Sequence, residues 1–418
     1  MYTKWNMKKI AVVFPGQGSH FIGMYKALYD EYEIVRETIK EAEQVTGINL
    51  SELCFKGPLS VLSRSKNAHV AILAFGVAAF RVFVSETGLI PQFCAGHSLG
   101  EYTALVCAGT LKFSDALKLV QIRSEISEEI KKTSNSGMTI IDGIETNIVE
   151  NICKEQQIKG KKVYVSCYNS DTQTAISGIN DDLQEAEKII HRENCTVSPL
   201  FNSAPFHCPI MEGGINALKN LIKSIEFGEF RYPVMSNYTG KPYIKEEEFE
   251  INLLKHLTNP VKWIDIINYF ESKDVNLIID FSANNIFEKI IGSNNSIRTV
   301  CFGVKRERET LFRLFQGPEY TSSRSTFISK SIIAAISTPN FNYDEKKYND
   351  GVVENYKILQ ELGVELDSGR AIYSQDMKKN ILTLLKLIFQ AKNVNRDEQN
   401  RWIQQILDET ASSYENLI

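Results

Sequence analysis

Along its first third, the chain alternates between short apolar runs and longer stretches with helical spacing of apolar positions. Residues 10–14 are an unbroken apolar run that stops at Pro15-Gly16-Gln17-Gly18, which predicts a buried strand and a tight turn. A second strand, turn and helix are predicted over residues 92–108, with helical stretches over about 26–46 and 68–86 between the two strands. Strands that alternate with helices predict an α/β fold with a parallel sheet.

A different order of elements follows over residues 137–203. Strands are predicted at 138–141, 163–166, 174–177 and 196–201, and helices at 147–157 and 180–192. This βαββαβ order is that of a ferredoxin-like subdomain. The α/β pattern resumes with a helix over 209–224 and a strand over 277–280. We therefore expect a large subdomain over residues 1–136 and 204–317, with residues 137–203 inserted into it.

The last part of the chain, residues 318–418, is predicted to be a linker followed by a helical extension. Residues 320–325 and the polar segment 340–350 have the composition of linkers and loops. Two amphipathic helices follow, whose apolar faces are formed by Ile381, Leu384, Leu385 and Ile388 and by Trp402, Ile403, Ile406 and Leu407. We expect this extension to pack on the main body; a module that docks a partner is the alternative.

The composition is that of a soluble intracellular protein. Of the 418 residues, 47 are basic and 51 acidic, so the chain lacks the basic excess that nucleic-acid binding requires. The longest apolar stretch, Val70 to Phe80, is shorter than the roughly 20 residues that span a bilayer. The N-terminal residues contain no signal-peptide core, and the 8 cysteines include no Cys-x-x-Cys pair. We expect a cytoplasmic protein with reduced thiols, no metal site, and neither a membrane nor a nucleic acid as partner.

The segment Gly96-His97-Ser98-Leu99-Gly100 matches the Gly-x-Ser-x-Gly nucleophile elbow and lies between a predicted strand and a predicted helix. In such a turn the serine hydroxyl is exposed, and the next backbone N–H, that of Leu99, points at a developing oxyanion. A serine nucleophile needs a base. None of the 6 histidines lies beyond His256, which disfavours a lipase or esterase. His207 lies in a junction loop, where catalytic groups are common, although its spacing fits a structural histidine equally well.

Two further features gain a role only in combination with Ser98. The glycine-rich turn after the first strand lacks the lysine of a P-loop and the third glycine of a dinucleotide-binding fingerprint. It can supply a second oxyanion N–H from Gln17, or it can be an ordinary tight turn. Arg123 lies on the helix that follows the elbow helix, where an arginine is usually solvated. This arginine matters if the substrate carries an anionic group.

Taken together, these motifs resemble those of the malonyl-CoA:acyl carrier protein transacylase family. They are Phe14-Pro-Gly-Gln-Gly-Ser19, Gly96-His-Ser-Leu-Gly-Glu-Tyr102, Arg123 and Ala204-Pro-Phe-His207, and the resemblance covers about residues 8–317. More closely, the chain is similar to free-standing acyltransferases that serve polyketide or hybrid polyketide–peptide synthases in trans. The resemblance implies an α/β-hydrolase-like parallel-sheet core with an inserted ferredoxin-like subdomain.

The resemblance also implies what the site residues do. Ser98 takes a malonyl group from the CoA thioester and passes it to the phosphopantetheine thiol of an acyl carrier protein, with His207 as general base and then acid. The backbone N–H groups of Gln17 and Leu99 hold the oxyanion, and Arg123 binds the free carboxylate of the malonyl group. The family needs no cofactor beyond these substrates, and we expect a monomer.

In this family a backbone carbonyl, rather than a carboxylate, orients the catalytic histidine. The matching residue, before the motif Asn259-Pro-Val-Lys-Trp263, is His256, where the family has glutamine. His69 and Ser127 occupy pocket positions where glutamine and methionine are common, and Phe206 resembles the malonyl-selective version of the family. These departures affect the preference for acyl groups rather than the chemistry.

Two other functions stay open. A proofreading hydrolase of the same fold would release acyl chains from carriers by attack of water, and a degenerate acyltransferase would dock carriers without catalysis. Arg123 favours transfer, because a hydrolase of monocarboxylic acyl groups has no use for a buried cation. The intact set of Ser98, His207 and Arg123 disfavours the non-catalytic alternative.

Overall fold

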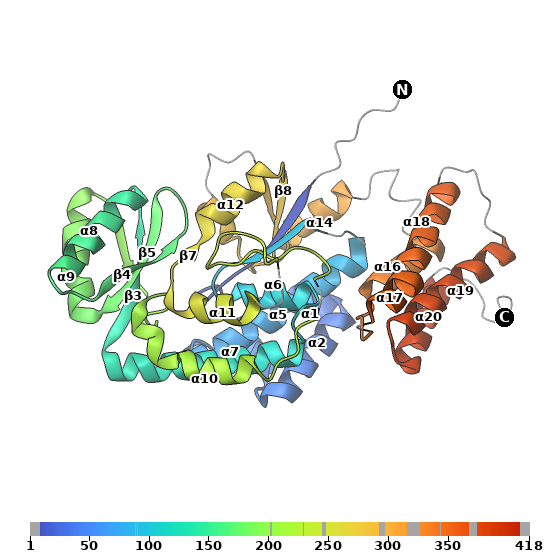
Figure 1. Cartoon of the computed structure of the whole chain (residues 1–418), viewed down its shortest axis with the longest axis horizontal. Helices are drawn as coiled ribbons and strands as arrows, with labels where there is room; N and C mark the ends of the chain where they lie inside the picture. Colours follow the sequence, from blue (N-terminus) through green and yellow to red (C-terminus); the bar gives the residue numbers. More distant parts are fainter. Residues whose placement is uncertain are drawn as a thin grey trace, which may run out of the picture. The chain divides into compact units, whose positions relative to one another are not determined.

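The computed structural model describes residues 9–87, 89, 91–200, 203–228, 230–244, 248–291, 297–315, 327–342, 344–367 and 374–409 (Figure 1). The described residues form two compact units. The first lies within residues 1–82 and 90–308, and the second within 83–89 and 309–418. The predicted linker 320–325 and the predicted boundary between residues 317 and 318 lie outside the described residues.

The first unit contains a four-stranded parallel sheet of order β2-β1-β8-β9. Its strands are β1 (Ile10–Phe14), β2 (Phe93–Gly96), β8 (Leu277–Asp280) and β9 (Arg298–Cys301). Every residue of β1 and β8 is buried, as expected for a parallel sheet that helices cover on both faces. Val13 of β1 belongs to a buried cluster with Phe270 of α12 (Trp263–Ser272), whereas Phe14 contacts Phe80 of α5 (Ser65–Thr87) on the other face.

The other α-helices that lie wholly in the first unit, outside the inserted residues 137–203, match the predicted helices only in part, and several boundaries differ. They are α1 (Lys26–Glu31), α2 (Glu33–Thr46), α3 (Leu50–Lys56), α4 (Leu59–Leu62), α6 (Gly100–Cys107), α7 (Phe113–Ser134), α10 (Ile215–Ile222), α11 (Glu248–Thr258) and α13 (Phe287–Ile291). The helix predicted over 26–46 is interrupted at Tyr32, whose backbone is extended. The helix predicted over 209–224 begins as a 3₁₀ helix (Pro209–Gly214), which ends in the glycine pair Gly213-Gly214, and glycine has a low α-helix propensity.

The apolar stretch expected over residues 70–80 is part of a longer helix. α5 spans 23 residues and is long and apolar enough to cross a bilayer by length and composition alone, contrary to the prediction. However, 83% of its most apolar 18-residue window is buried inside the structure. A helix that is apolar all round and buried in this way is typical of the core of a large protein.

A five-stranded sheet of order β6-β3-β5-β4-β7 forms the inserted subdomain (Figure 1). Its strands are β3 (Ser136–Asp142), β4 (Val163–Tyr168), β5 (Gln173–Ile179), β6 (Thr196–Pro199) and β7 (Val261–Lys262). With α8 (Thr146–Ile158) and α9 (Asn180–Ile190), strands β3 to β6 have the βαββαβ order and antiparallel pairing of a ferredoxin-like subdomain. The fifth strand was not predicted. β7 comes from the large subdomain and pairs in parallel with β4, which joins the second sheet to the motif around Trp263.

The described part of the second unit is largely helical. Its helices are α16 (Phe327–Ser337), α17 (Glu345–Tyr348), α18 (Glu354–Asp367), α19 (Gln375–Ala391) and α20 (Arg396–Glu409), and α14 (Lys305–Leu314) enters it from the first unit. The apolar faces predicted for the last two helices are buried or packed in one cluster with residues of α16 and α18. The loop predicted over 340–350 is wrong in its second half, where α17 continues through a π-helical turn (Asn349–Val353) into α18. Tyr348 and Val352 pack on this cluster, and their burial stabilises helix in a segment with a polar composition.

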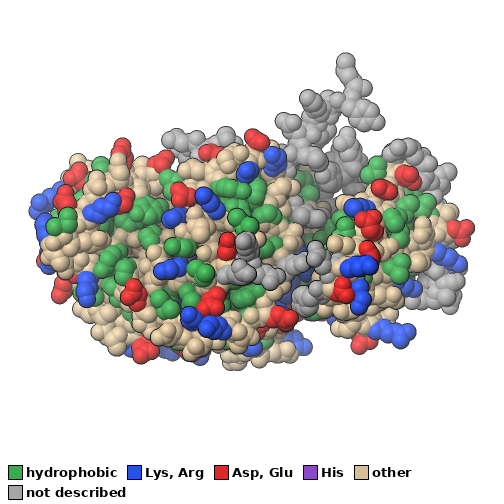
Figure 2. Space-filling view, in the orientation of Figure 1, with side chains coloured by type: hydrophobic (Ala, Val, Ile, Leu, Met, Phe, Trp, Pro, Cys, Tyr) green, Lys and Arg blue, Asp and Glu red, His purple; other side chains and the backbone are tan. Residues whose placement is uncertain are grey.

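Charges of both signs lie side by side on the surface. Figure 2 shows Lys and Arg side chains interspersed with Asp and Glu over the described part of the face in view. Some form exposed pairs within one helix, such as Lys26 with Asp30 at 2.6 Å and Lys154 with Glu150 at 2.7 Å. Such pairs contribute at most about 1 kcal/mol each, so the buried apolar clusters provide most of the stability.

Candidate active site

Ser98 lies in a sharp turn between β2 and α6. Because Phe14 of β1 pairs with Gly96 of β2, the turns that follow both parallel strands lie at the same edge of the sheet. The chain passes so close to β1 that a Cβ atom at Gly100 would lie 2.2 Å from the carbonyl oxygen of Phe14. Ser98 has a φ of +53°, in the left-handed region that residues other than glycine rarely adopt. This is the strained strand–turn–helix geometry of a nucleophile elbow.

The Ser98 hydroxyl meets the ring of His207. Oγ of Ser98 is 2.6 Å from Nε2 of His207, and Nδ1 on the other side of the ring is 2.7 Å from the backbone carbonyl oxygen of His256. Nδ1 carries the hydrogen that this carbonyl accepts, so Nε2 is the unprotonated nitrogen and the Ser98 hydroxyl donates to it. The structure therefore brings together the serine and the histidine whose relationship the spacing left open.

His207 is held in its neutral form. The residue is 1% exposed, and burial followed by the positive charge of Arg123 lowers its pKa to about 3. The hydrogen bond to the His256 carbonyl acts in the opposite direction, because it favours the protonated ring. A neutral imidazole with a free Nε2 is the form that can accept a proton from a hydroxyl group.

Arg123 is buried beside this pair rather than solvated. It is 1% exposed, its Nη2 donates to Oγ of Ser98 at 3.2 Å, and its guanidinium carbon lies 4.1 Å from the centroid of the Phe206 ring. Nη1 is buried without a hydrogen-bond partner, and Arg123 forms no ion pair with a carboxylate among the described residues. Burial lowers the pKa of Arg123, but an arginine in a protein stays protonated. An unpaired buried cation is costly, so this site favours a ligand that brings an anion.

The backbone amides of Gln17 and Leu99 lie in the two turns that meet at this sheet edge. The turns touch: the N–H of His97 donates to the carbonyl of Phe14 at 2.9 Å, and a Cβ atom at Gly16 would lie 2.6 Å from the carbonyl oxygen of His97. In the described part of the chain, neither the N–H of Gln17 nor that of Leu99 has a protein acceptor. Leu99 also precedes the first turn of α6, where the helix dipole favours negative charge.

Comparison with known proteins shows which family the chain belongs to. Residues 11–287 match the model of the acyl transferase domain family. The chain is 30% identical over 397 residues to a malonyl CoA-acyl carrier protein transacylase of Bacillus subtilis, and the match covers 94% of this chain and 99% of that protein. The chain belongs to the malonyl-CoA:acyl carrier protein transacylase family.

Solved transacylases have the same fold. The enzyme of Xanthomonas oryzae matches with a TM-score of 0.71 at 27% identity, covering 73% of this chain and 98% of its own. A malonyl transacylase solved in complex with a type II polyketide synthase acyl carrier protein matches with a TM-score of 0.70 at 30% identity, covering 73% and 99%. These structures confirm the predicted α/β fold with its parallel sheet. The Bacillus subtilis transacylase matches a larger share of the chain than either solved structure does.

His69, where the transacylase family often has glutamine, connects the turn that contains Gln17 to α7. It is fully buried, with Nδ1 2.7 Å from Oγ of Ser124 and Nε2 3.1 Å from Oε1 of Gln17. Its ring centroid is 6.0 Å from that of Phe206. Burial, followed by the charge of Arg123, holds the pKa of His69 well below its usual range. The side chain is therefore a neutral member of the group around Arg123.

The other two departures from the family pattern differ in where their side chains lie. Ser127 is buried on α7, one turn after Arg123, but its hydroxyl donates to the carbonyl of Ser124 at 2.8 Å and contacts no other predicted site residue by hydrogen bonding. The ring of His256 stacks on His207, with centroids 4.8 Å apart. Burial holds the pKa of His256 well below its usual range, so His207 has a neutral neighbour.

Three residues that were not predicted from the sequence stabilise the nucleophile elbow through hydrogen bonds. Oδ1 of Asn237 accepts the backbone N–H of Ser98 at 2.7 Å. Glu101 accepts hydrogen bonds from the backbone N–H of Asn237 at 2.9 Å and from the hydroxyl of Tyr243, and burial raises its pKa to about 7. Glu101 was part of the quoted motif, but a glutamate in the first turn of a helix is unremarkable by itself. Asn237 and Tyr243 lie in no motif, so only the fold reveals their contact with Ser98 and its helix.

His97 makes its contacts away from the Ser98 hydroxyl. Its Nε2 lies 2.7 Å from Oδ1 of Asn169, which follows β4 in the second sheet, and its ring packs edge-on against Trp263 with centroids 5.4 Å apart. Burial lowers the pKa of His97. This histidine therefore anchors the elbow to the inserted subdomain instead of acting on Ser98.

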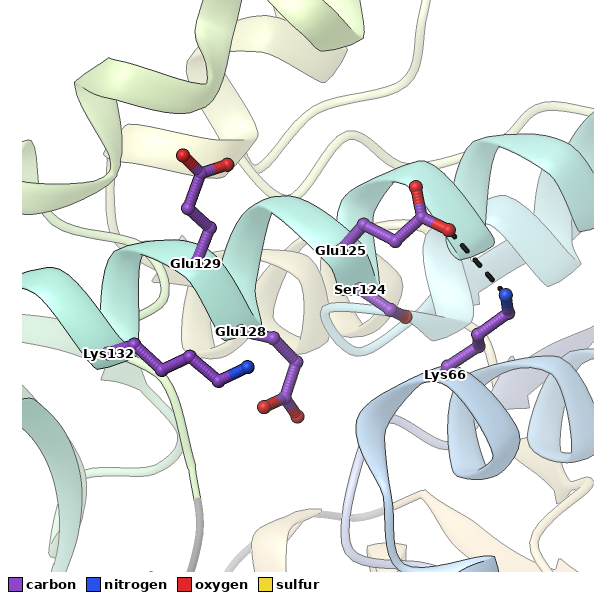
Figure 3. Close-up of a pocket in the computed structure, with 6 residues that line it drawn as sticks. All are labelled: Lys66, Ser124, Glu125, Glu128, Glu129 and Lys132. Carbon is purple, nitrogen blue, oxygen red and sulfur yellow. Dashed lines mark ion pairs between the residues drawn. The ribbon is translucent and has the colours of Figure 1, made fainter.

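A separate pocket of about 330 Å³ lies beside α7 and is not this site. It is lined by Lys66 of α5 and by Ser124, Glu125, Glu128, Glu129 and Lys132 of α7 (Figure 3). None of these is a predicted catalytic or substrate-binding residue, and Lys66 pairs with Glu125 at 3.6 Å. Among the described residues, no group of three His, Cys, Asp or Glu side chains could hold a metal ion.

Proposed function

We propose that the protein transfers a malonyl group from malonyl-CoA to the phosphopantetheine thiol of an acyl carrier protein through an acyl-enzyme on Ser98. The observation that carries this proposal is the buried guanidinium of Arg123, which contacts Oγ of Ser98 at 3.2 Å and leaves Nη1 without a partner. In a malonyl thioester, one methylene group separates the carboxylate from the thioester carbonyl. Such a substrate can pair its carboxylate with Arg123 while its carbonyl carbon lies at Ser98.

In the first half-reaction, Oγ of Ser98 bonds to the thioester carbonyl carbon and its proton moves to Nε2 of His207. The N–H groups of Gln17 and Leu99 donate to the oxyanion that forms. When the carbon–sulfur bond breaks, the CoA sulfur takes the proton from Nε2. The products are free CoA, a malonyl ester on Ser98 and neutral His207.

The second half-reaction runs the same steps with the carrier thiol. The thiol gives its proton to Nε2 of His207 and its sulfur bonds to the ester carbonyl carbon. As the ester bond breaks, Oγ of Ser98 regains the proton, and the malonyl group leaves as a thioester of the carrier. The His256 carbonyl keeps the hydrogen on Nδ1 throughout, so Nε2 is always the nitrogen that exchanges protons.

Binding of the malonyl carboxylate also strengthens the base. The positive charge of Arg123 is the second cause of the low pKa of His207, after burial. A carboxylate bound to Arg123 compensates this charge, so the proton affinity of His207 rises when a dicarboxylic acyl group is present. An acetyl group brings no such compensation. Recognition of malonate and proton transfer at Ser98 are therefore linked through one guanidinium.

We further propose that the protein works in the cytoplasm, without a metal or cofactor, for a polyketide or hybrid polyketide–peptide synthase in trans. The similarity to a malonyl transacylase solved with a type II polyketide synthase carrier supports this pathway class. All 8 cysteines are buried free thiols, which fits a reducing compartment.

Mass spectrometry of the intact protein tests the proposal. After incubation with malonyl-CoA, wild-type protein is expected to gain one malonyl group and to pass it to a carrier with phosphopantetheine but not to one without it. Ser98→Ala is expected to gain none, whereas Ser331→Ala, which removes a buried hydroxyl of the second unit, is expected to react like the wild type. Release of monocarboxylic acyl groups from carriers faster than malonyl loading would identify a hydrolase. Failure to form an acyl-enzyme with any acyl-CoA would identify a docking protein.

A further inference from the structure

Asn237 uses all four of its polar groups around the nucleophile elbow. In its side chain, Oδ1 accepts the backbone N–H of Ser98 at 2.7 Å and Nδ2 donates to the carbonyl of Gly96 at 2.6 Å. In its backbone, the N–H donates to Oε2 of Glu101 at 2.9 Å and the carbonyl accepts the N–H of Lys262 at 2.9 Å. Asn237 is fully buried. The groups that it binds belong to β2, to the first turn of α6 and to β7 of the second sheet.

The carboxamide of Asn237 has only one orientation that fits. If the amide were reversed, its NH₂ group would face the N–H of Ser98, which is also a donor. Its oxygen would face the carbonyl of Gly96, which is also an acceptor, so both hydrogen bonds would be lost. A buried polar group without a hydrogen-bond partner destabilises the fold, so the reversed orientation is excluded. Asn237 is therefore a rigid clamp across the peptide groups on both sides of His97.

Ser98 needs such a clamp because its backbone is strained. A φ of +53° is unfavourable in a residue with a Cβ atom, because the Cβ atom comes too close to the backbone in the left-handed region. This conformation brings Oγ within 2.6 Å of Nε2 of His207 and leaves the N–H of Leu99 without a protein acceptor among the described residues. Relaxation of Ser98 to a common conformation would move the hydroxyl and the oxyanion donor together.

We propose that Asn237 is a positioning residue for the acylation of Ser98. Its carboxamide keeps the strained peptide in the conformation in which the hydroxyl meets His207 and the Leu99 N–H faces the oxyanion. This inference rests on the part of the proposed function that makes Ser98 the nucleophile. It does not depend on which acyl group Ser98 carries.

The test is the rate constant of Ser98 modification per folded molecule, measured with two reagents. One is malonyl-CoA, and the other is a small fluorophosphonate, which reacts with activated serines and carries no carboxylate for Arg123. Asn237→Ala is expected to lower both rate constants about 10- to 100-fold, the range expected when a reacting group is misplaced by a fraction of an ångström to 1 Å. The KM for malonyl-CoA is expected to change less than about twofold, because Arg123 keeps its contact with the Phe206 ring and its unpartnered Nη1 remains available for the carboxylate.

Asn342→Ala is the matched control. Asn342, in the second unit, also bridges backbone groups with its carboxamide, accepting the N–H of Asp344 at 3.0 Å and donating to the carbonyl of Ala391 at 2.7 Å. This variant is expected to lower the melting temperature without changing either rate constant. Rate constants within twofold of wild type in folded Asn237→Ala would overturn the proposal.

Asn237→Asp provides a second test that does not require a smaller side chain. The new carboxyl group can still accept the N–H of Ser98, but it can donate to the Gly96 carbonyl only when it is protonated. The ratio of its rate constant to that of wild type is expected to rise as the pH is lowered, and a ratio independent of pH contradicts the proposal. Wild-type protein that reacts with the fluorophosphonate but not with malonyl-CoA would contradict the proposed function, while the fluorophosphonate rates still decide the role of Asn237.

Discussion

The guanidinium carbon of Arg123 lies 4.1 Å from the centroid of the Phe206 ring, and Phe206 directly precedes His207. A cation over an aromatic face is stabilised by about 0.5–2 kcal/mol, more when both groups are shielded from water, as here. The ring therefore supports the arginine as well as filling the space beside it. The resemblance of Phe206 to the malonyl-selective version of the family did not imply this contact with Arg123.

Two substitutions of Phe206 distinguish the cation–π contact with Arg123 from the steric effect of the ring. Phe206→Leu keeps much of the volume and removes the aromatic face, whereas Phe206→Ser removes both. We expect both variants to load malonyl more slowly, by about tenfold, because each loses the cation–π contact. Only Phe206→Ser is expected to raise the ratio of kcat/KM for methylmalonyl-CoA to that for malonyl-CoA, by about 10-fold or more, since one methyl group is worth about 1–3 kcal/mol. An equal rise in Phe206→Leu would show that ring bulk does not set the preference.

Arg123→Ala tests recognition of the carboxylate. We expect malonyl loading to fall about 100-fold or more, because the variant loses a charge-assisted hydrogen bond in a buried site, and acetyl loading to fall less than about tenfold. The measurement is the acyl-enzyme formed from each CoA ester by rapid quench. Arg308→Ala is the control, since Arg308 is also buried but binds the carbonyl of Phe302 and Glu31 away from Ser98. Equal losses for malonyl and acetyl groups would give Arg123 a structural role only.

His207 is expected to act as a base well below the usual pKa of histidine. Only the neutral ring accepts the Ser98 proton, and its pKa is lowered from 6.5 to about 3 by burial and then by Arg123. Acylation by acetyl-CoA should therefore not decline as the pH falls through 6.5. In Arg123→Gln the positive charge is gone, so the pKa of His207 is higher and the acid limb of the pH profile moves to higher pH.

The folded fraction must be followed in the same experiment. Below pH 6.5, His207 binds a proton in the unfolded chain but not in the native protein. This residue therefore makes unfolding more favourable as the pH falls. Rates are therefore divided by the folded fraction from circular dichroism. A wild-type profile with its midpoint near 6.5 after this correction would contradict a depressed pKa at His207.

The elbow could be predicted from the sequence because its determinants are local. A buried strand, a five-residue turn with small residues and a helix specify where Ser98 lies, and the parallel sheet then brings the turn after β1 to the same edge. The ferredoxin-like order was readable for the same reason, since each strand and helix has its own period of apolar positions. The local pattern did not predict helix where burial of a few side chains stabilises it. The helical segment from Glu345 to Asp367 is an example, because its polar first half packs on the apolar cluster through Tyr348 and Val352.

The rest of the site depends on contacts between distant residues, which no local pattern carries. Ser98 and His207 are 109 positions apart, and Ser98 and Asn237 are 139 apart. The spacing of His207 fitted a structural histidine as well as a catalytic base, and only the resemblance to a family favoured the catalytic role. Arg123 looked like a solvated residue because helical periodicity shows which face it lies on but not what packs there. Asn237 left no signal, because a buried asparagine is recognised only by the backbone groups that it satisfies.

Gly100 marks the place where the elbow has no room for a side chain. In Gly100→Ala the new Cβ would lie 2.2 Å from the carbonyl oxygen of Phe14 and 2.9 Å from that of Pro15, both backbone atoms that cannot move without disturbing β1 and its turn. We expect the free energy of unfolding to fall by about 3 kcal/mol or more and acylation of Ser98 to be lost, because α6 must move away from β1. Gly213→Ala is the control, since no atom lies within 4 Å of its new Cβ, and its unfolding free energy is expected to stay within about 0.5 kcal/mol of wild type. Urea unfolding and malonyl loading measure both variants, and a stable, active Gly100→Ala would show that β1 and α6 are not in contact as described.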